Sequence, residues 1–193
     1  MTPGSPPPAL APAPVLHGDG VVLRAFADGD ADLVRAASID PFIPLVTTVP
    51  HDADQAAALA FVARQHERVR TGVGHSFVIV DRPSGWASGQ IGLWRHDARH
   101  SRASIGYWVA APFRGRGLAR RALATVAAWG LGPEGFARVE LYVEPWNVAS
   151  WRTAESAGFT REGLLRSWES VGGERRDMYM YSRLPGDPPR ETL

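Results

Sequence analysis

The sequence predicts an α+β domain built on a largely antiparallel sheet with one parallel step. Apolar residues switch repeatedly between a spacing of two and a spacing of about 3.6, so strands and helices alternate along the chain. A strand–helix–strand unit around residues 103–143 implies a right-handed parallel crossover, whereas the other strands are mostly joined as hairpins. We therefore expect a mixed sheet of about seven strands, flanked by helices.

The first half of the chain predicts three strands and two helices. Strands are expected over residues 21–26, 75–80 and 89–95, with the turn signal Pro83-Ser-Gly85 before the third. A short helix is expected over 28–37 and a longer one over 54–70. The longer helix has an apolar face made of Ala58, Phe61, Val62 and Val69.

The crossover unit begins with a strand over 103–109 and ends with a strand over 138–143. The helix between them shows one apolar face, made of Leu118, Ala122, Val126 and Trp129. Gly130 or Gly132 should end this helix, because glycine adopts the left-handed conformation that closes helices.

The last part of the chain predicts one helix and a hairpin. A helix from about 148 to 157 ends at Gly158, a natural left-handed C′ residue. Strands near 163–170 and 177–182 are joined by Val171-Gly-Gly173, which is a hairpin signal.

Proline sets the expected domain boundaries. Residues 1–16 contain six prolines, which favour polyproline II over a helix or a central strand, so we expect a flexible tail. This tail lacks the basic start and apolar stretch of a signal peptide. Residues 185–193 resemble a second frayed end, which leaves one domain over 17–184. No apolar run approaches membrane-spanning length.

The composition excludes several kinds of chemistry. The 193 residues contain no Cys, which rules out disulfides, Cys-based zinc sites and thiol nucleophiles, and which fits a reducing cytoplasm. All 21 cationic side chains are Arg, so a Schiff-base lysine and a Walker-type phosphate lysine are excluded as well. The formal net charge of +1 gives no strong attraction for DNA or an acidic membrane.

No metal site is expected. His96 and His100 are four residues apart, which is a ligand spacing only when both lie on one helix. Here they flank Asp97-Ala-Arg99 in a predicted hairpin loop, so we interpret them as surface histidines.

The segment 112–121 (PFRGRGLARR) has the features of a phosphate-binding loop. It leaves a strand and opens a helix, and Gly115 and Gly117 let backbone N–H groups converge without side-chain obstruction. The dinucleotide fingerprint needs a third Gly or Ala where this chain has Arg120, and the Walker loop needs a lysine. The alternative is a glycine-rich turn with a solvated basic helix start. The order strand, Arg, two glycines, helix favours a phosphate site.

Arg114-Gly-Arg-Gly-Leu-Ala119 resembles the acetyl-CoA pyrophosphate motif of the GNAT acetyltransferases. Five flanking segments are similar to the RimJ/RimL-type branch of that family, which includes ribosomal-protein N-terminal acetyltransferases: Ile105-Gly-Tyr-Trp-Val109, Glu144-Pro-Trp-Asn-Val-Ala-Ser150, Ala157-Gly-Phe159, Glu162-Gly-Leu-Leu-Arg166 and Asp177-Met-Tyr179. The resemblance covers about residues 20–183. It implies the GNAT (acyl-CoA N-acyltransferase) fold, with acetyl-CoA held where the fourth and fifth predicted strands splay apart.

The resemblance also implies which residues contact acetyl-CoA. The pyrophosphate would be held by the loop, namely Arg114, Gly115, Arg116, Gly117, Leu118 and Ala119. The pantetheine would lie along Trp108, Val109 and Ala110. Asn147 and Ser150 match the Asn-x-x-Ser motif of the stalk-protein serine acetyltransferase, in which the Asn contacts coenzyme A and the Ser protonates the departing thiolate. The alternative is a purely structural role, in which Asn147 is a helix N-cap and Ser150 is the third residue of that helix.

The general base is less clearly marked than the proton donor. Many relatives carry a carboxylate at the start of the fourth strand, where this chain has Ser104. In the stalk-protein enzyme the proposed base lies nineteen residues after the serine, which corresponds to Glu169 here. Glu169 could equally be a solvent-facing strand residue. Glu140 and Glu144 are alternative carboxylates, and Glu140 is interpreted as structural or solvated.

In this fold the irregular segment 40–48 commonly borders the acceptor, so we expect it to shape specificity. Among the tryptophans, Trp129 should be core, and core packing is the default for Trp94, Trp108 and Trp168 near the acceptor cleft.

The resemblance, together with these residues, implies a cytoplasmic N-acetyltransferase that moves acetyl from acetyl-CoA to a primary amine by direct attack in a ternary complex. The acceptor is left open between a protein N-terminus and a small amine, as is the formation of a homodimer. The rival hypothesis is a catalytically silent acyl-CoA-binding sensor. It is credible because Ser104 stands where many relatives carry a carboxylate.

Overall fold

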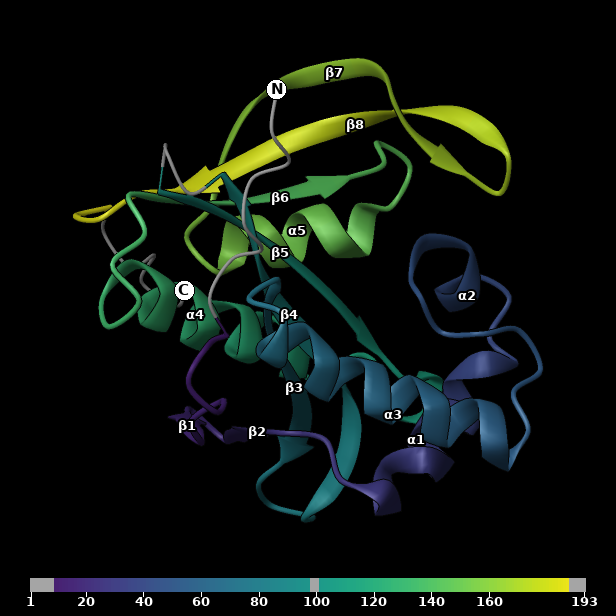
Figure 1. Ribbon diagram of the computed structural model, residues 1–193. Helices are drawn as coiled ribbons and strands as arrows, with labels where there is room; N and C mark the ends of the chain where they lie inside the picture. The colour runs from purple at the N-terminus through teal and green to yellow at the C-terminus, as the bar shows by residue number, and fades with distance from the viewer. Residues whose placement is uncertain (1–8, 98–100, 188–193) are drawn as a thin grey trace, which may run out of the picture.

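The structure is a computed structural model that describes residues 9–97 and 101–187. It contains one eight-stranded sheet in the order β1-β2-β3-β4-β5-β6-β8-β7 (Figure 1). The strands are β1 (Leu16–Gly18), β2 (Val21–Arg24), β3 (Gly74–Asp81), β4 (Trp86–Asp97), β5 (Arg102–Val109), β6 (Arg138–Val143), β7 (Thr160–Val171) and β8 (Glu174–Arg183). The helices are α1 (Ala31–Ser38), α2 (Ile43–Val46), α3 (Gln55–Arg70), α4 (Leu118–Leu131) and α5 (Val148–Ser156).

The predicted α+β architecture is confirmed. Strand pairs are antiparallel except for β5 and β6, which are parallel and joined by the crossover helix α4. The strand count is one higher than expected, because residues 16–18 pair with β2 as β1. Ahead of β1, the Leu10 N–H donates to the Val69 carbonyl at 2.9 Å and Ala13 packs on the core, so ordered contacts begin before residue 17. Residues 1–8 of the expected N-terminal tail and 188–193 of the C-terminal one lie outside the described residues.

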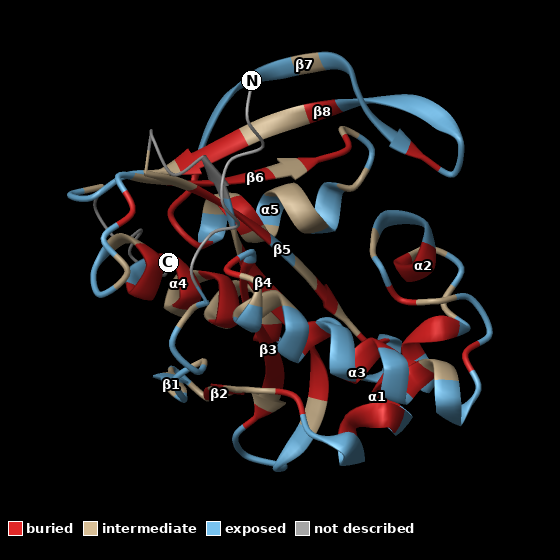
Figure 2. Cartoon of the chain, in the orientation of Figure 1, coloured by how far each residue is buried: buried red, intermediate tan, exposed pale blue. Residues whose placement is uncertain are grey.

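Two layers of helices bury the two faces of the sheet (Figure 2). Phe77 and Ile79 of β3 pack in the same core cluster as α4, whereas Val78 between them packs with α1 and α3. This alternation is what a strand buried on both faces requires. Trp129 on α4 is buried as predicted.

Two local features differ from the prediction, and a third prediction falls on residues that the structure does not describe. Residues 43–46 form the short helix α2 within the segment expected to be irregular, because Asp40 Oδ1 accepts the N–H groups of Phe42 and Ile43 and so caps the turn. Trp168 is not core: it is 49% exposed and stacks on Tyr142. His100 and the side chain of His96 lie outside the described residues.

The parallel pair β5–β6 stays together only at its beginning. Arg102, Ala103 and Ser104 pair with Arg138, Val139 and Glu140, and beyond these pairs the two strands separate. The expected splay between the two strands is therefore present, and it opens toward the carboxyl ends of β5 and β6.

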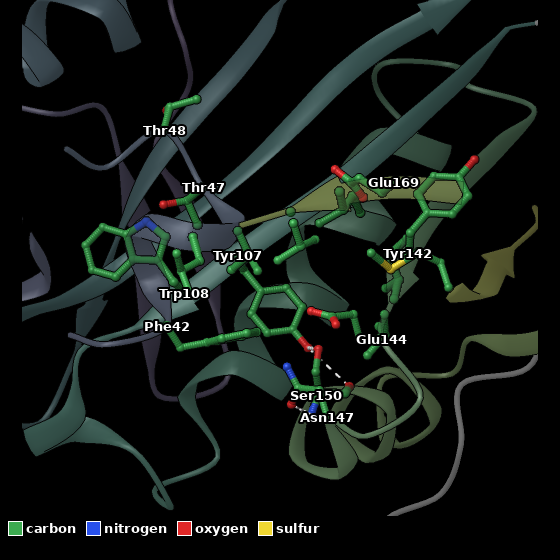
Figure 3. Close-up of a pocket in the computed structure, with 18 of the residues that line it drawn as sticks. Phe42, Thr47, Thr48, Tyr107, Trp108, Tyr142, Glu144, Asn147, Ser150 and Glu169 are labelled. Carbon is green, nitrogen blue, oxygen red and sulfur yellow. Dashed lines mark hydrogen bonds between the residues drawn. The ribbon is translucent and has the colours of Figure 1, made fainter. Parts of the chain in front are cut away.

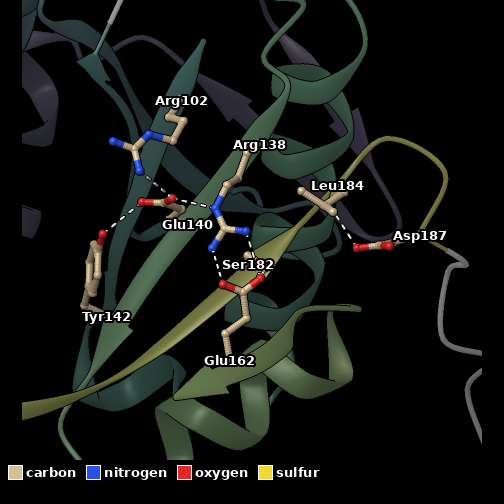
Figure 4. Close-up of polar contacts among 8 residues, drawn as sticks. All are labelled: Arg102, Arg138, Glu140, Tyr142, Glu162, Ser182, Leu184 and Asp187. Atoms are coloured by element: carbon tan, nitrogen blue, oxygen red, sulfur yellow. Dashed lines mark hydrogen bonds and ion pairs between the residues drawn. The ribbon is translucent and has the colours of Figure 1, made fainter. Parts of the chain in front are cut away.

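A polar cluster centred on the buried Glu140 lies at the closed end of this splay (Figure 4). Glu140 is 2% exposed, and its carboxylate accepts hydrogen bonds from Arg138 Nε at 2.6 Å and from the Tyr142 hydroxyl at 2.9 Å. Arg138 also contacts both oxygens of Glu162, and the Ser182 hydroxyl donates to Glu162 at 2.6 Å. The cluster joins β6, β7 and β8, so Glu140 is structural, as interpreted, and is not solvated.

The Glu162 ion pair should make stability depend on pH. The hydrogen bond from Arg138 lowers the pKa of Glu162 from 4.5 to about 2. Stability from this pair is therefore complete above pH 4.5 and lost as the pH falls from 4.5 toward 2. Because the Glu162 side chain is 40% exposed, screening should limit the effect to about 1 kcal/mol. Between pH 4.5 and 2, the unfolding free energy of Glu162→Gln, measured by thermal unfolding, should fall less steeply with pH than that of wild type. An equally steep fall in the two proteins would contradict the assignment.

Two classes of feature are absent from the part of the chain that the structure describes. None of its helices is both long and apolar enough to cross a membrane. None of its clusters of three or more His, Asp or Glu side chains could hold a metal ion.

Candidate active site

A pocket of about 490 Å³ lies where β5 and β6 separate (Figure 3). Its walls come from β5, β6, the amino end of α5, the β7–β8 hairpin and the α2 segment. Phe42 and Thr47, within the segment expected to shape specificity, are among the lining residues. Elements distant in sequence thus meet at the open end of the splay.

Ser150 and Asn147 face this pocket from the first turn of α5. Asn147 is the N-cap of the helix, and its Oδ1 accepts the Ser150 N–H at 3.1 Å. Both residues also line the pocket. The structural role and the functional role considered for these residues are therefore compatible, since capping leaves the Ser150 hydroxyl directed into the cavity.

Tyr107 is the direct partner of Ser150. The two hydroxyl oxygens are 2.9 Å apart, and the Tyr107 hydroxyl also donates to the Ser150 carbonyl at 3.2 Å. Burial raises the pKa of Tyr107, although its hydrogen bonds with Ser150 and Thr153 act in the opposite direction. A protonated phenol next to a serine hydroxyl can pass a proton to it. Two signals in the sequence could have marked Tyr107. It lies in the segment Ile105–Val109 that resembles the family, and period-two alternation puts it on the same strand face as Ile105 and Val109.

Glu169 reaches the same pocket from β7. The strand is irregular between Leu165 and Glu169, and Ser167 has a positive φ of 51°, so the hairpin bends before Glu169. Glu169 is exposed, whereas Glu144, one of the alternative carboxylates, lines the pocket from the end of β6 and is buried. Ser104, at the position where many relatives carry a carboxylate, does not line the pocket. It is buried where β5 and β6 are still paired.

The predicted phosphate loop has the backbone that its glycines allow. Gly115 and Gly117 have φ values of 77° and 72°, in the left-handed region, and Gly117 is the N-cap of α4. The first intrahelical bond runs from the Arg121 N–H to the Gly117 carbonyl. The N–H groups of Leu118, Ala119 and Arg120 precede it and are the free donors of a helix N-terminus. The Leu118 side chain is buried in the core, so only its backbone is available to a ligand.

The arginines of the loop brace it in this structure. Arg114 donates to Asp40 Oδ2 at 2.6 Å and to the Val109 carbonyl at 3.0 Å, so its guanidinium ties the loop to the α2 segment. Burial alone would raise the pKa of Asp40, but the N–H groups of Phe42 and Ile43 and the Arg114 side chain lower it. Arg116 donates to the Pro112 carbonyl at 3.1 Å. The Arg114 side chain, predicted to face a pyrophosphate, is therefore directed to a carboxylate instead.

The end of β5 offers an unpaired strand edge to the pocket. Trp108 and Val109 pair with Gln90 and Gly89 of β4, and no strand covers their other edge in the described chain. The Trp108 side chain is buried, and its Nε1 donates to Gln90 Oε1 at 2.8 Å. The Ala110 N–H is used by the Ser88 carbonyl. A ligand lying along this edge would thus meet backbone groups of Trp108 and Val109.

A splayed parallel pair with a glycine loop at the start of the next helix occurs in a known family. The sequence model of the acetyltransferase (GNAT) domain matches residues 21–160. The chain belongs to the GNAT family. Its fold is the GNAT fold, and it is an N-acetyltransferase by family, as the resemblance implied.

Relatives and solved structures of similar length match almost the whole chain, and one of them is a RimJ protein. An uncharacterized N-acetyltransferase, p20, of Bacillus licheniformis is 28% identical over 88% of this chain and 95% of its own length. The RimJ structure from Mycobacterium smegmatis, in complex with a coenzyme A disulfide, is 26% identical, with a TM-score of 0.74 over 92% of this chain and 89% of that one. A RimL ribosomal-protein acetyltransferase in complex with coenzyme A is 20% identical, with a TM-score of 0.74 over 89% and 98%.

Proposed function

We propose that this GNAT protein transfers acetyl from acetyl-CoA to a primary amine by direct attack in a ternary complex. The acceptor would be a protein N-terminus or a small amine. The observation that carries the proposal is the convergence of Tyr107, Ser150 and Glu169 on one pocket beside an unpaired edge of β5. With no Cys in the chain, no thiol can carry the acetyl group, which supports direct transfer.

The residues of the loop and of β5 suit acetyl-CoA. The left-handed glycines leave the N–H groups of residues 115–119 open to a pyrophosphate, and each charge-assisted hydrogen bond there would contribute about 1.5–3 kcal/mol. The free edge at Trp108 and Val109 would pair with the pantetheine amides. Ala110, which was also expected to contact the pantetheine, has its N–H bonded to Ser88 and its carbonyl bonded to Phe113. Bound in this way, acetyl-CoA would supply a thioester carbonyl to the pocket. Arg114 would leave Asp40, or share its charge between the carboxylate and the pyrophosphate.

Three side chains would carry the proton transfers. Glu169 would take a proton from the acceptor amine, directly or through a water, so that the nitrogen can attack the carbonyl carbon. Ser150 would donate its proton to the departing thiolate, and the Tyr107 hydroxyl at 2.9 Å would replace that proton. The N–C bond forms as the C–S bond breaks. The tetrahedral adduct loses a second N–H proton, which returns through water to the Tyr107 phenolate, and the proton taken by Glu169 is released to solvent.

The proposed machinery suits an amine of low pKa. An α-amine has a pKa of about 7.7–8.0, so about a tenth of it is neutral at pH 7, whereas a lysine amine near 10.4 offers far less. An α-amine would therefore place the smaller demand on Glu169, whose side chain is exposed. We place the enzyme in the cytoplasm, with no DNA or membrane partner.

Acetyl transfer is tested by incubating the protein with acetyl-CoA and a panel of amines, and by measuring free thiol. The panel would contain a serine amide, spermidine and an aminoglycoside. We expect amine-dependent thiol release for at least one of them. Binding of coenzyme A without amine-dependent release from any panel amine would favour the rival function of an acyl-CoA sensor.

Tyr107→Phe should distinguish a role of Tyr107 in proton transfer from a role in packing alone. The variant keeps the ring and loses only the hydroxyl bonded to Ser150. We expect turnover to fall about tenfold, at the low end of general acid–base effects, with coenzyme A affinity unchanged. Steady-state kinetics with calorimetry would measure both. Tyr181→Phe, which removes a hydroxyl bonded to Glu155 outside the pocket, is the matched control. Equal turnover in wild type and Tyr107→Phe would remove Tyr107 from the proton transfer.

A further inference from the structure

Glu144 is a buried carboxylate that the proton transfers above do not use. It directly follows β6, is 6% exposed and lines the pocket. Figure 3 shows its carboxylate directed toward the part of the pocket where Tyr107 and Ser150 meet, whereas Glu169 enters from another side.

Only one of the two Glu144 oxygens has a partner. Oε2 accepts a hydrogen bond from Trp146 Nε1 at 2.7 Å, and Arg176 Nε is 3.9 Å from the same oxygen. Oε1 has no hydrogen-bond partner among the described residues and has less than 1 Å² of accessible surface. Burying a carboxylate oxygen without a donor is costly. Bulk water does not reach this oxygen. A ligand that enters the pocket and displaces the side chains covering Oε1 would supply the missing donor.

The cations near the pocket are already engaged. Arg176 is 2.6 Å from Glu174 and reaches Glu144 only on the Oε2 side. Arg68 lines the pocket but donates to Gln65 at 2.7 Å and to Thr48 at 3.0 Å, over the ring of Trp94. Neither arginine is positioned to satisfy Oε1.

Backbone hydrogen bonds hold Glu144 in a fixed relation to Ser150. The Glu144 carbonyl accepts the Asn147 N–H at 3.0 Å, and the Asn147 side chain accepts the Ser150 N–H at 3.1 Å. The turn from Glu144 to Asn147 and the cap of α5 thus form one hydrogen-bonded unit, which carries the side chains of both Glu144 and Ser150. A cationic donor bound at Glu144 would lie beside the residue proposed to protonate the leaving thiolate.

We infer that Glu144 Oε1 binds the amino group of the acceptor as an ammonium and orients it for attack. This inference rests on the proposed function. An ammonium from a primary amine has three N–H bonds, so one can remain on Glu144 while another loses its proton to Glu169. The nitrogen then keeps a hydrogen bond to Glu144 and has a free lone pair for the carbonyl carbon. Acceptors without a cationic nitrogen would leave Oε1 unpaired, so alcohols are disfavoured.

Ethylammonium chloride provides a test that needs neither the natural acceptor nor turnover. The Trp146 indole N–H, which is bonded to Glu144, reports on the site by NMR and can be assigned with Trp146→Phe. In the coenzyme A complex we expect a saturable shift of this signal at about millimolar concentrations, and none with tetramethylammonium, which has no N–H donor. Glu144→Gln keeps an oxygen for Trp146 and should weaken ethylammonium binding at least about tenfold.

Glu67→Gln is the matched control, because it removes a carboxylate that pairs with Arg70 on α3, outside the pocket. An equal ethylammonium response in wild type and Glu144→Gln would overturn the inference, as would a wild type that shows no saturable response. With the best amine of the panel, Glu144→Gln should raise the KM for the amine about tenfold or more and leave coenzyme A affinity unchanged. If no amine is acetylated, the proposed function fails, while the ethylammonium titration still decides the role of Glu144.

Discussion

Gly117→Glu should abolish measurable coenzyme A binding while the protein stays folded. Gly117 is the N-cap of α4, with a φ of 72°, at the point where the helix N-terminus would face the pyrophosphate. A glutamate there would place a negative charge against the phosphates and block the approach to the N–H groups. Losing two charge-assisted hydrogen bonds removes at least about 3 kcal/mol, which is more than 100-fold in affinity. Isothermal calorimetry with coenzyme A measures the loss.

Gly85→Glu controls for backbone strain in this experiment. Gly85 has a φ of 73° in the β3–β4 turn, and nothing lies within 4 Å of an added Cβ. At Gly117 only the end of the Arg121 side chain comes near, at 3.9 Å. Both variants should therefore lose about 1 kcal/mol of stability through strain, and only Gly117→Glu should lose coenzyme A. Undiminished affinity in Gly117→Glu would refute the loop as the pyrophosphate site.

Ser150→Ala should lower turnover about 100-fold, within the range of general acid catalysis. The Ser150 hydroxyl is the only part removed, and the N-cap bond from its backbone N–H to Asn147 stays. Alanine is also favourable inside a helix, so α5 should remain folded. Stopped-flow or steady-state measurement of thiol release gives the rate, and calorimetry should show coenzyme A affinity within about threefold of wild type.

Ser156→Ala is the matched control for Ser150→Ala, since Ser156 is an exposed serine at the other end of α5. Its turnover should equal that of wild type. An unchanged rate in Ser150→Ala would take Ser150 out of the mechanism. A loss of coenzyme A affinity as large as the loss of rate would indicate a binding role instead.

Much of the fold could be predicted because its signals are local. The apolar face of α4 and the left-handed Gly115 and Gly117 each follow from neighbouring residues, and the structure contains all of them. The splay came instead from the family resemblance. The motif of Asn147 and Ser150 is also local, which is why both could be placed at one helix start.

The partners of these residues could not be predicted because they are distant in sequence. Arg114 pairs with Asp40, 74 positions away, so a residue that looked like a phosphate ligand in its own motif also has a carboxylate partner. Tyr107 meets Ser150 across 43 positions. Glu144 differs from the other glutamates only in burial and in its unpaired oxygen, and neither property is visible in the sequence.

The short parallel contact between β5 and β6 divides the sheet into two blocks, β1–β5 and β6–β8, joined by three residue pairs. Such a joint is a pivot, since a small rotation about it displaces the far ends of the two strands more than the near ends. The polar cluster around Glu140 and Arg138 lies at this pivot. We therefore expect substitutions at Glu140 or Arg138 to change the width of the opening between β5 and β6, and with it the size of the molecules that can enter.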